Sequence, residues 1–363
     1  MRIGDLCSYA PKSSIKAGEA ESDGEYMFFT SSIDESKRYN DFQLDCEGII
    51  MGTGGNATLH YYNGKFSTST DCVVLLPNDT VRCKYLYYFF LYNISILENG
   101  FKGAGLKHTN KNYINSIDIP TLPTLEEQDK VIEILDKVQF IINGRASELL
   151  KLDELIKARF VEMFGNAENG ESKYPLTLLG NLATKISDGV HAKPEYTESG
   201  RPFLSVVNIN QKKVNFTDCK YVSEEAYQKM IKSTYPEKGD VLYTKVGATY
   251  GIPAYVDTDT EFCLYVSVCL IKPDHNKINS RFLAIQMDTP FVKHQADKRI
   301  KGIGVPDLHL NQIKEFQIVC PPRQLQDEFV EFVKQIDKSK VVVQKALDEA
   351  QLLFDSLMQQ YFG

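Results

Sequence analysis

A run of basic side chains beside a glycine turn is the first feature of this sequence that could do chemistry. The stretch "KHQADKRIKG" contains Lys293, Lys298, Arg299 and Lys301 against a single acid, Asp297. Such a cluster is suited to neutralising phosphates, the contact that supplies most of the affinity of proteins for nucleic acids. A solvated surface position explains any one of these side chains equally well, so the prediction concerns the set.

Short polar side chains in a second stretch are suited to reading base edges. The segment "ISDGVHAKPEY" offers Ser187, Asp188, His191, Lys193 and Tyr196 in a predicted loop. Side chains of these types can reach the edges of bases in the major groove. The alternative is a turn in which Asp-Gly only shapes the backbone.

Glycine turns in both halves of the chain carry further candidates for DNA contacts. Lys245, Thr249 and Tyr250 surround Gly247 in a predicted strand-to-strand turn. The candidates in the first half are Thr53, Asn56, His60, Tyr61, Lys65, Lys102, Lys107 and His108. As a set, these residues are predicted to mark the face that binds DNA.

The motifs of a catalyst are missing from the sequence. The only Pro-Pro pair, Pro321-Pro322, lacks the amide or carboxylate and the aromatic residue of a DNA methyltransferase loop, and "MGTGGN" runs into a strand-like tail where a cofactor site needs a helix. The eight cysteines form no Cys-x-x-Cys pair and the six histidines show no ligand spacing. We expect a binding protein with no catalytic residue, metal or cofactor of its own.

Composition and charge are compatible with a DNA-binding protein of two or more domains. The chain has 363 residues, 43% of them hydrophobic, and a net charge of −7. Residues 124–165 hold nine acids and six bases, and residues 322–363 hold seven and five, so these two segments carry −5 of the total. The remainder is nearly balanced, which leaves room for basic faces. Because the sequence has neither an 18-residue apolar run nor a signal peptide, we expect a cytoplasmic protein.

The elements that would position these residues occur twice. The segment "DELIKARFVEMFG" at 153–165 resembles "QLLFDSLMQQYFG" at 351–363, which lies 198 residues further along the chain. At the same displacement, Gln128 matches Gln326 and Asp129 matches Asp327. Each segment begins just after a proline and ends at a glycine, which predicts long helices over 123–165 and 321–363.

Apolar residues at heptad spacing run along both predicted helices, in steps of three and four except where Arg145 and Lys340 occupy the intervening position. They are Val131, Leu135, Val138, Ile142, Leu149, Leu152 and Ile156 in the first, and Val333, Ile336, Val343, Leu347, Ala350, Phe354 and Leu357 in the second. We call these fourteen residues the helix seam. The spacing is that of a heptad repeat and predicts that the two helices pack on each other as an antiparallel coiled coil. The alternative is that each helix lies separately on its own globular domain.

The repeat extends upstream of both helices and predicts the domain organisation. "FKGAGLKHTNKNYINSIDI" at 101–119 matches "IKGIGVPDLHLNQIKEFQI" at 300–318. Segments 1–122 and 166–320 are rich in Val, Tyr and Phe broken by Gly and Pro, as in half-buried strands. We therefore predict an α+β fold with a pseudo-two-fold internal repeat, in which two mixed α/β domains, 1–122 and 166–320, alternate with two long helices.

Four features together resemble the DNA-specificity subunits of type I restriction-modification systems. They are "GDVLYTKVGATYG" at 239–251, "ISDGVHAKPEYTESGRPFLSVVNI" at 186–209, Pro-x-x-x-x-Gln before each long helix, and the "MFG" and "YFG" endings. The resemblance implies two target recognition domains that each read half of a bipartite, asymmetric site. It also implies helices that set the spacing and dock two methyltransferase subunits. S-adenosylmethionine, and ATP with Mg for restriction subunits that can join, would then be bound by the partners.

Two other classes of protein compete with this interpretation. A stand-alone modification enzyme would need the cofactor loop and the amide-Pro-Pro motif that are missing. A coiled-coil scaffold with two protein-binding modules would have the same helices, but it would select no DNA sequence.

Overall fold

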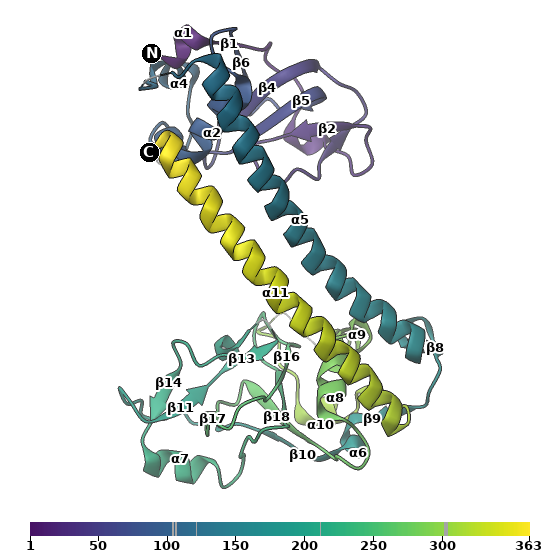
Figure 1. Ribbon diagram of the computed structural model, residues 1–363. Coiled ribbons are helices and arrows are strands. Elements are labelled where there is room, and N and C mark those ends of the chain that lie inside the picture. The colour runs from purple at the N-terminus through teal and green to yellow at the C-terminus, as the bar shows by residue number, and fades with distance from the viewer. Residues whose placement is uncertain (104, 106, 121, 211, 301–303) are drawn as a thin grey trace. The chain divides into compact units, whose positions relative to one another are not determined.

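The computed structural model describes residues 1–363 except 104, 106, 121, 211 and 301–303. The chain divides into two compact units, one formed by residues 1–148 and 343–363 and the other by residues 149–342. The two longest elements are α5 (Leu125–Phe164) and α11 (Arg323–Phe362), each of 40 residues (Figure 1). Each unit therefore contains a globular part together with part of both long helices.

The globular part of the first unit is built around one sheet of six strands. The strands are β1 (Cys7–Tyr9), β2 (Tyr26–Phe29), β3 (Arg38–Tyr39), β4 (Leu44–Gly52), β5 (Leu59–Thr68) and β6 (Cys72–Pro77). The helices are α1 (Ile3–Leu6), η1 (Ala17–Glu19), α2 (Cys83–Tyr92), α3 (Ile94–Glu98) and α4 (Lys111–Ser116). The strand order is β1-β6-β4-β5-β2-β3, and only the β2–β5 pair is parallel.

The core of the first unit joins this globular part to both long helices. Leu86 and Phe90 of α2 are fully buried in one apolar cluster with Leu135 of α5 and Phe354 of α11. The ring of Tyr88 lies 6.2 Å from that of Phe354. Helix α2 thus lies between the sheet and the long helices in the packing of this unit.

The globular part of the second unit contains several smaller sheets. Its strands are β7 (Gly165–Asn166), β8 (Glu171–Ser172), β9 (Leu176–Leu178), β10 (Ala183–Asp188), β11 (Arg201–Leu204), β12 (Ile209–Asn210), β13 (Lys213–Val214), β14 (Lys220–Val222), β15 (Val241–Thr244), β16 (Pro253–Tyr255), β17 (Cys263–Leu264), β18 (Val268–Pro273) and β19 (Gln317–Val319). Its helices are η2 (Ala167–Asn169), α6 (Leu179–Leu182), η3 (Val206–Asn208), α7 (Glu224–Met230), α8 (Ser280–Met287), α9 (Pro290–Asp297) and α10 (Leu310–Lys314). The two largest sheets have the orders β10-β18-β15-β16 and β14-β11-β17.

An aromatic cluster joins α8 to the long helices in the second unit. The rings of Phe160 and Phe164 of α5 each lie 5.5 Å from Phe329 of α11, and Phe282 of α8 packs against all three. Four of these five contacts are edge-on and one is stacked, arrangements that are favourable for aromatic pairs. Helix α8 therefore has the place in this unit that α2 has in the first.

The ends of α5 are set by local sequence chemistry. The hydroxyl of Thr124 accepts from the backbone N–H of Glu127, and the Glu127 carboxylate accepts in return from the backbone N–H of Thr124. This capping box satisfies two otherwise unpaired donors, and the bonds from Thr124 lower the pKa of Glu127. At the other end Gly165 has φ +82°, and a Cβ there would lie 2.1 Å from the carbonyl oxygen of Glu171. Only glycine fits that position.

All fourteen residues of the helix seam are buried or half-buried. The prediction of mixed α/β character with two long helices is confirmed, and α5 continues without a break through Asn143-Gly144.

The eight cysteines are free thiols, and five of them are buried. In the described residues, no helix combines the length and the apolar character that a membrane span requires.

Candidate nucleic-acid interface

Three segments of the second unit meet around Lys245. Lys245 follows β15, and its backbone N–H donates to Ser267 while its carbonyl accepts from Leu308. Val246 forms a β-bridge with Asp307, and the N–H of Gly247 donates to the carbonyl of Pro306. The turn that the sequence singled out is therefore held against the 304–308 segment.

Lys245 is buried, contrary to the usual place of a lysine that contacts DNA. Its side chain is 5% exposed, and its ammonium lies 3.7 Å from Asp188 Oδ2 and 3.2 Å from Asp307 Oδ1. A buried cation needs such partners because its hydration is lost. In this structure Lys245 acts as an internal tie between the ends of β10 and β15 and the 304–308 segment.

Asp188 is the partner of Lys245 whose carboxylate is incompletely hydrogen-bonded. Its Oδ1 is buried and has no hydrogen-bond partner among the described residues. Burial raises the pKa of Asp188 above its ordinary value, and the charges of Lys245 and His191 offset part of that rise. His191 itself is exposed, with Nε2 3.8 Å from Asp188 Oδ2. Ser187, next to Asp188, accepts a hydrogen bond from the Thr234 hydroxyl.

A second group of predicted residues is joined through α9. The Lys293 ammonium lies 3.3 Å from the centre of the Tyr250 ring and 3.2 Å from Asp297 Oδ1. The Tyr250 hydroxyl donates to the same Asp297 oxygen at 2.6 Å, and this bond raises the pKa of Tyr250. Thr249, beside this group, is exposed. The Lys293 charge is thus shared with a carboxylate before any ligand arrives.

The remaining basic residues of this stretch differ in their surroundings. Lys298 is exposed and forms no ion pair with the described residues. Arg299 is half-buried, donates to the Gln295 carbonyl at 2.9 Å and lies over the Phe316 ring. Lys301 lies outside the described residues. Among the described members of this set, Lys298 is the one best suited to a phosphate contact.

Tyr196 and Lys193 lie in a different part of the second unit from Lys245. Tyr196 is partly exposed and packs on Phe203 of β11, with the ammonium groups of Lys193 and Lys220 both within 6 Å of its ring. An aromatic ring with two cations is a group that can take part in binding nucleic acid. Lys220 was missed by the sequence analysis because it lies on β14, distant in sequence from the predicted loop.

The structure brings together five of the predicted residues of the first unit. Backbone bonds join Gly55 to Lys107 and Thr109 to Thr53, and the backbones of Lys102 and His108 bond to each other. Asn56, Lys102, Lys107 and His108 are exposed, and Thr53 is half-buried with its hydroxyl donating to the Asp71 carbonyl. The two lysines make no ion pair with the described residues.

The other three predicted residues of the first unit lie along β5 and have intramolecular partners. His60 is 3% exposed, and its ring nitrogens contact Glu35 Oε1 and the Ser32 carbonyl, each at 2.8 Å. The Tyr61 hydroxyl donates to Glu47 Oε1, whereas Lys65 is exposed with its ammonium over the Phe42 ring. A buried histidine with both nitrogens engaged is suited to holding the Ser32–Glu35 loop.

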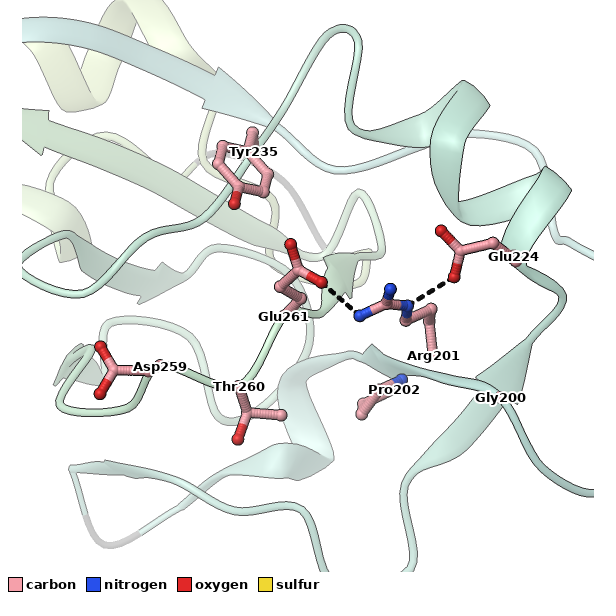
Figure 2. Close-up of a pocket in the computed structure, with 8 residues that line it drawn as sticks. All are labelled: Gly200, Arg201, Pro202, Glu224, Tyr235, Asp259, Thr260 and Glu261. Atoms are coloured by element: carbon pink, nitrogen blue, oxygen red, sulfur yellow. Dashed lines mark hydrogen bonds and ion pairs between the residues drawn. The ribbon is translucent and has the colours of Figure 1, made fainter.

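One hollow in the second unit does not suit a phosphate. It has a volume of about 850 Å³ and is lined by Gly200, Arg201, Pro202, Glu224, Tyr235, Asp259, Thr260 and Glu261 (Figure 2). Arg201 is held by both Glu224 and Glu261, so its charge is neutralised. With Asp259, the lining carries three carboxylates against one guanidinium, a balance that repels a DNA backbone.

Asp307 and Thr234 are partners of predicted residues that the sequence analysis missed. Both lie far along the chain from the residues they contact, and isolated Asp and Thr residues give no signal in the sequence. Among the described residues, no group of three or more His, Cys, Asp or Glu side chains is arranged to hold a metal ion.

Comparison with known families gives a match over most of the chain. The model of the type I restriction modification DNA specificity domain matches residues 1–151 and 179–350. The match therefore occurs in both halves of the repeat.

Individual relatives and a solved structure agree with this match. The chain is 23% identical over 326 residues to the type I restriction enzyme MjaVIII specificity subunit of Methanocaldococcus jannaschii, with 82% of this chain and 75% of the relative covered. It is 21% identical over 375 residues to the EcoDI specificity subunit of Escherichia coli, with coverages of 95% and 82%. The crystal structure of a type I S subunit from M. genitalium has a TM-score of 0.67 at 16% identity and covers 100% of this chain and 95% of its own, so the fold is similar.

The Lys245 cluster predicts a pH-dependent loss of stability in Lys245→Met. Without the ammonium, the partly buried Asp188 carboxylate loses its main compensating charge, and we expect a cost of about 3 kcal/mol at pH 7. Burial already raises the pKa of Asp188, and the variant raises it further. Since a raised carboxyl pKa costs stability only where the group is ionised, the loss should shrink as the pH falls toward about 4. Urea denaturation at both pH values measures this.

Lys238→Met is the matched control for this experiment. Lys238 pairs with Asp259 at 3.3 Å, but its side chain is 50% exposed, and such pairs contribute little. A loss for Lys245→Met that equals the control, or that does not change with pH, would contradict the role assigned to the buried pair.

Proposed function

The chain belongs to the family of type I restriction-modification DNA specificity domains, and we propose that its two globular domains, 1–122 and 166–320, each read one half of a bipartite, asymmetric DNA site. In this family the specificity subunit recognises DNA, and catalysis lies in other subunits of the complex. The observation that carries the proposal is the double match of the family model. Because the first unit has one sheet of six strands and the second has several smaller sheets, the two half-sites are expected to differ.

The long helices are proposed to form an antiparallel coiled coil that keeps the two half-sites at a fixed spacing. Two features support this assignment. The helix seam is turned away from solvent along both helices. Asp153 of α5 pairs with Lys340 of α11 at 2.5 Å, which adds a polar contact beside the apolar ones. A helix of 40 residues is about 60 Å long, which is enough to span several base pairs.

Exposed apolar residues on the long helices are proposed to dock two methyltransferase subunits. Phe140 of α5 is 79% exposed, and Val341 and Leu352 of α11 are about 70% exposed. Contiguous apolar patches that a subunit leaves in water commonly mark an interface, and Val341 and Leu352 are followed in the chain by the exposed Val342 and Leu353. The methyltransferase partners would bind S-adenosylmethionine. Restriction subunits, where they join the complex, would bind ATP and Mg. The complex is proposed to act in the cytoplasm.

The first prediction concerns the modified sequence in a host that carries the complete system. Methylation-sensitive sequencing should find one split motif with two unlike halves and a constant gap. The physical reason is that each half is read by a separate domain with its own side chains. An uninterrupted motif would contradict the two-reader proposal, and the absence of any motif would favour the scaffold alternative.

The second prediction concerns the exposed lysines of the first unit. Lys102→Ala with Lys107→Ala should weaken binding to all DNA sequences and reduce the slope of log affinity against log salt by about 1 to 2. Lys137→Ala is the control, because Lys137 is exposed on α5 but paired with Glu133. Fluorescence anisotropy at several salt concentrations measures both slopes, and equal slopes in variant and wild type would remove these lysines from the DNA face.

The third prediction concerns assembly. Phe140→Asp should leave the melting temperature of the chain unchanged but reduce its co-purification with the methyltransferase subunit, because the charge would be buried only in the complex. Phe354→Asp provides the contrast, since Phe354 is 6% exposed and the variant should unfold the first unit. Full assembly by Phe140→Asp would show that partners dock elsewhere.

A further inference from the structure

A buried glutamine at the start of each long helix makes two equivalent hydrogen bonds in both units. Gln128 of α5 and Gln326 of α11 are each 0% exposed. The side-chain oxygen of Gln128 accepts from the backbone N–H of Arg82 at 2.8 Å, and its NH₂ donates to the Pro123 carbonyl at 2.9 Å. A fully buried amide that uses both ends is a directional link between the segments it joins.

The second glutamine reproduces this link with different neighbours. Gln326 accepts from the backbone N–H of Asn279 at 2.7 Å and donates to the carbonyls of Pro321 and Lys277 at 2.8 Å and 3.2 Å. Asn279 is the N-cap of α8, as Arg82 is the N-cap of α2. In both units, therefore, the amide holds the start of the long helix to the start of the helix that packs on the sheet.

Carboxylates further along each long helix strengthen the link. Asp129 accepts two bonds from the Arg82 guanidinium, at 2.8 Å and 2.9 Å. Asp136, two turns on, accepts from Lys84 and Tyr88 of α2 at 2.7 Å and 2.6 Å. Together with Gln128, these contacts fix α2 along more than one turn of α5.

The second unit has the corresponding pairs. Asp327 accepts from the Asn279 side chain at 2.7 Å, and Asp337 accepts from Arg281 of α8 at 2.8 Å. We define the joint of each unit as its glutamine with these carboxylate pairs. The residues that contact the carboxylates differ between the units, but in both units the glutamine accepts from the backbone N–H of the N-cap residue of the packing helix, Arg82 or Asn279.

The length of the helices makes the angle at each joint critical. The hydrophobic effect is non-directional, whereas hydrogen bonds prefer near-linear geometry, so the polar contacts at each joint restrict its angle in a way that the apolar contacts do not. A tilt of about 10° at one end of a helix of about 60 Å moves its other end by about 10 Å. That displacement equals about three base-pair steps of DNA.

We propose that Gln128 and Gln326 are positioning residues that fix each recognition domain at one orientation on its long helix, and so determine the gap between half-sites without touching DNA. The inference rests on the proposed function. It assigns a role in specificity to residues outside every loop predicted to bind DNA.

The test uses the complete methyltransferase complex and a library of sites in which the half-sites are constant and the gap varies by up to two base pairs on either side. Gln128→Met and Gln326→Met keep the length of the side chain but remove its hydrogen bonds. We expect methylation at neighbouring gaps to rise about tenfold relative to the normal gap, the factor expected for loss of a buried hydrogen bond. The base preference within each half-site should stay the same.

Matched controls lie on the same helices. Gln324→Met changes an exposed glutamine in the first turn of α11 that donates to Glu328. Gln139→Met changes a half-buried glutamine on α5 whose amide donates to Asn143 on the same helix. Both should keep the sharp gap preference of the wild type. Variants of Gln128 and Gln326 that lose activity equally at all gaps, with the preference still sharp, would show a role in stability alone and overturn the proposal.

A milder variant and a second measurement keep the test decisive if Gln128→Met assembles poorly. Asp129→Asn weakens the bond to Arg82 at the exposed edge of the same joint and should broaden the gap preference to a smaller extent. Hydrogen exchange should show faster exchange of the Arg82 amide in Gln128→Met, and an unchanged rate would contradict the joint. A wild-type complex that recognises no split motif would instead disprove the proposed function and leave the measured exchange as a structural result.

Discussion

A helix of 40 residues with a continuous apolar seam cannot remain stable in water unless another surface covers that seam, and this constraint governs the structure. A small sheet with one covering helix offers too little apolar surface for the whole seam. In each unit the solution is the same, because parts of both long helices share one core with the globular part. The globular domains and the helices are consequently not independent folding modules, and a domain cut from the chain at a helix boundary would lose part of its core.

The two halves of the chain match at the buried glutamines, which satisfy backbone groups through their side chains. They differ in their sheets, where strand pairing satisfies the backbone. Gln128 and Gln326 each fill a buried site in which both a donor and an acceptor are required, so no apolar residue replaces them without cost. The backbone groups of the sheets are satisfied by strand pairing and do not require a particular polar side chain. Six strands in one sheet and four in the largest sheet of the other unit are both adequate supports for loops.

The sequence predicted the helices more accurately than it predicted the candidate site, for a physical reason. Helix ends depend on residues close in sequence, such as Thr124 with Glu127 and Gly165 at its positive φ, and these can be found by inspection. The surroundings of Lys245 depend on Asp188 and Asp307, which are distant in sequence, and a lysine beside a glycine turn gives no sign that it is buried. The same is true of His60, whose partner Glu35 lies on a loop that no periodicity reveals.

The distribution of charge limits which surfaces can meet DNA. The long helices carry most of the net negative charge of the chain, and many of their lysines are already paired with neighbouring acids, as Lys130 is with Glu126. Exposed pairs of this type contribute little stability, but they leave no surplus of positive charge to attract a phosphate backbone. The acidic hollow around Arg201 is excluded for the same reason. Among the described residues, the exposed lysines without an ion pair include Lys102, Lys107 and Lys298 on loops of the globular parts. Lys151, Lys157 and Lys338 on the long helices are also exposed and pair with no acid that the structure describes, but the net charge of those helices is negative. Contact with DNA is therefore expected from those loops, and the helices are left to the tasks of spacing and assembly.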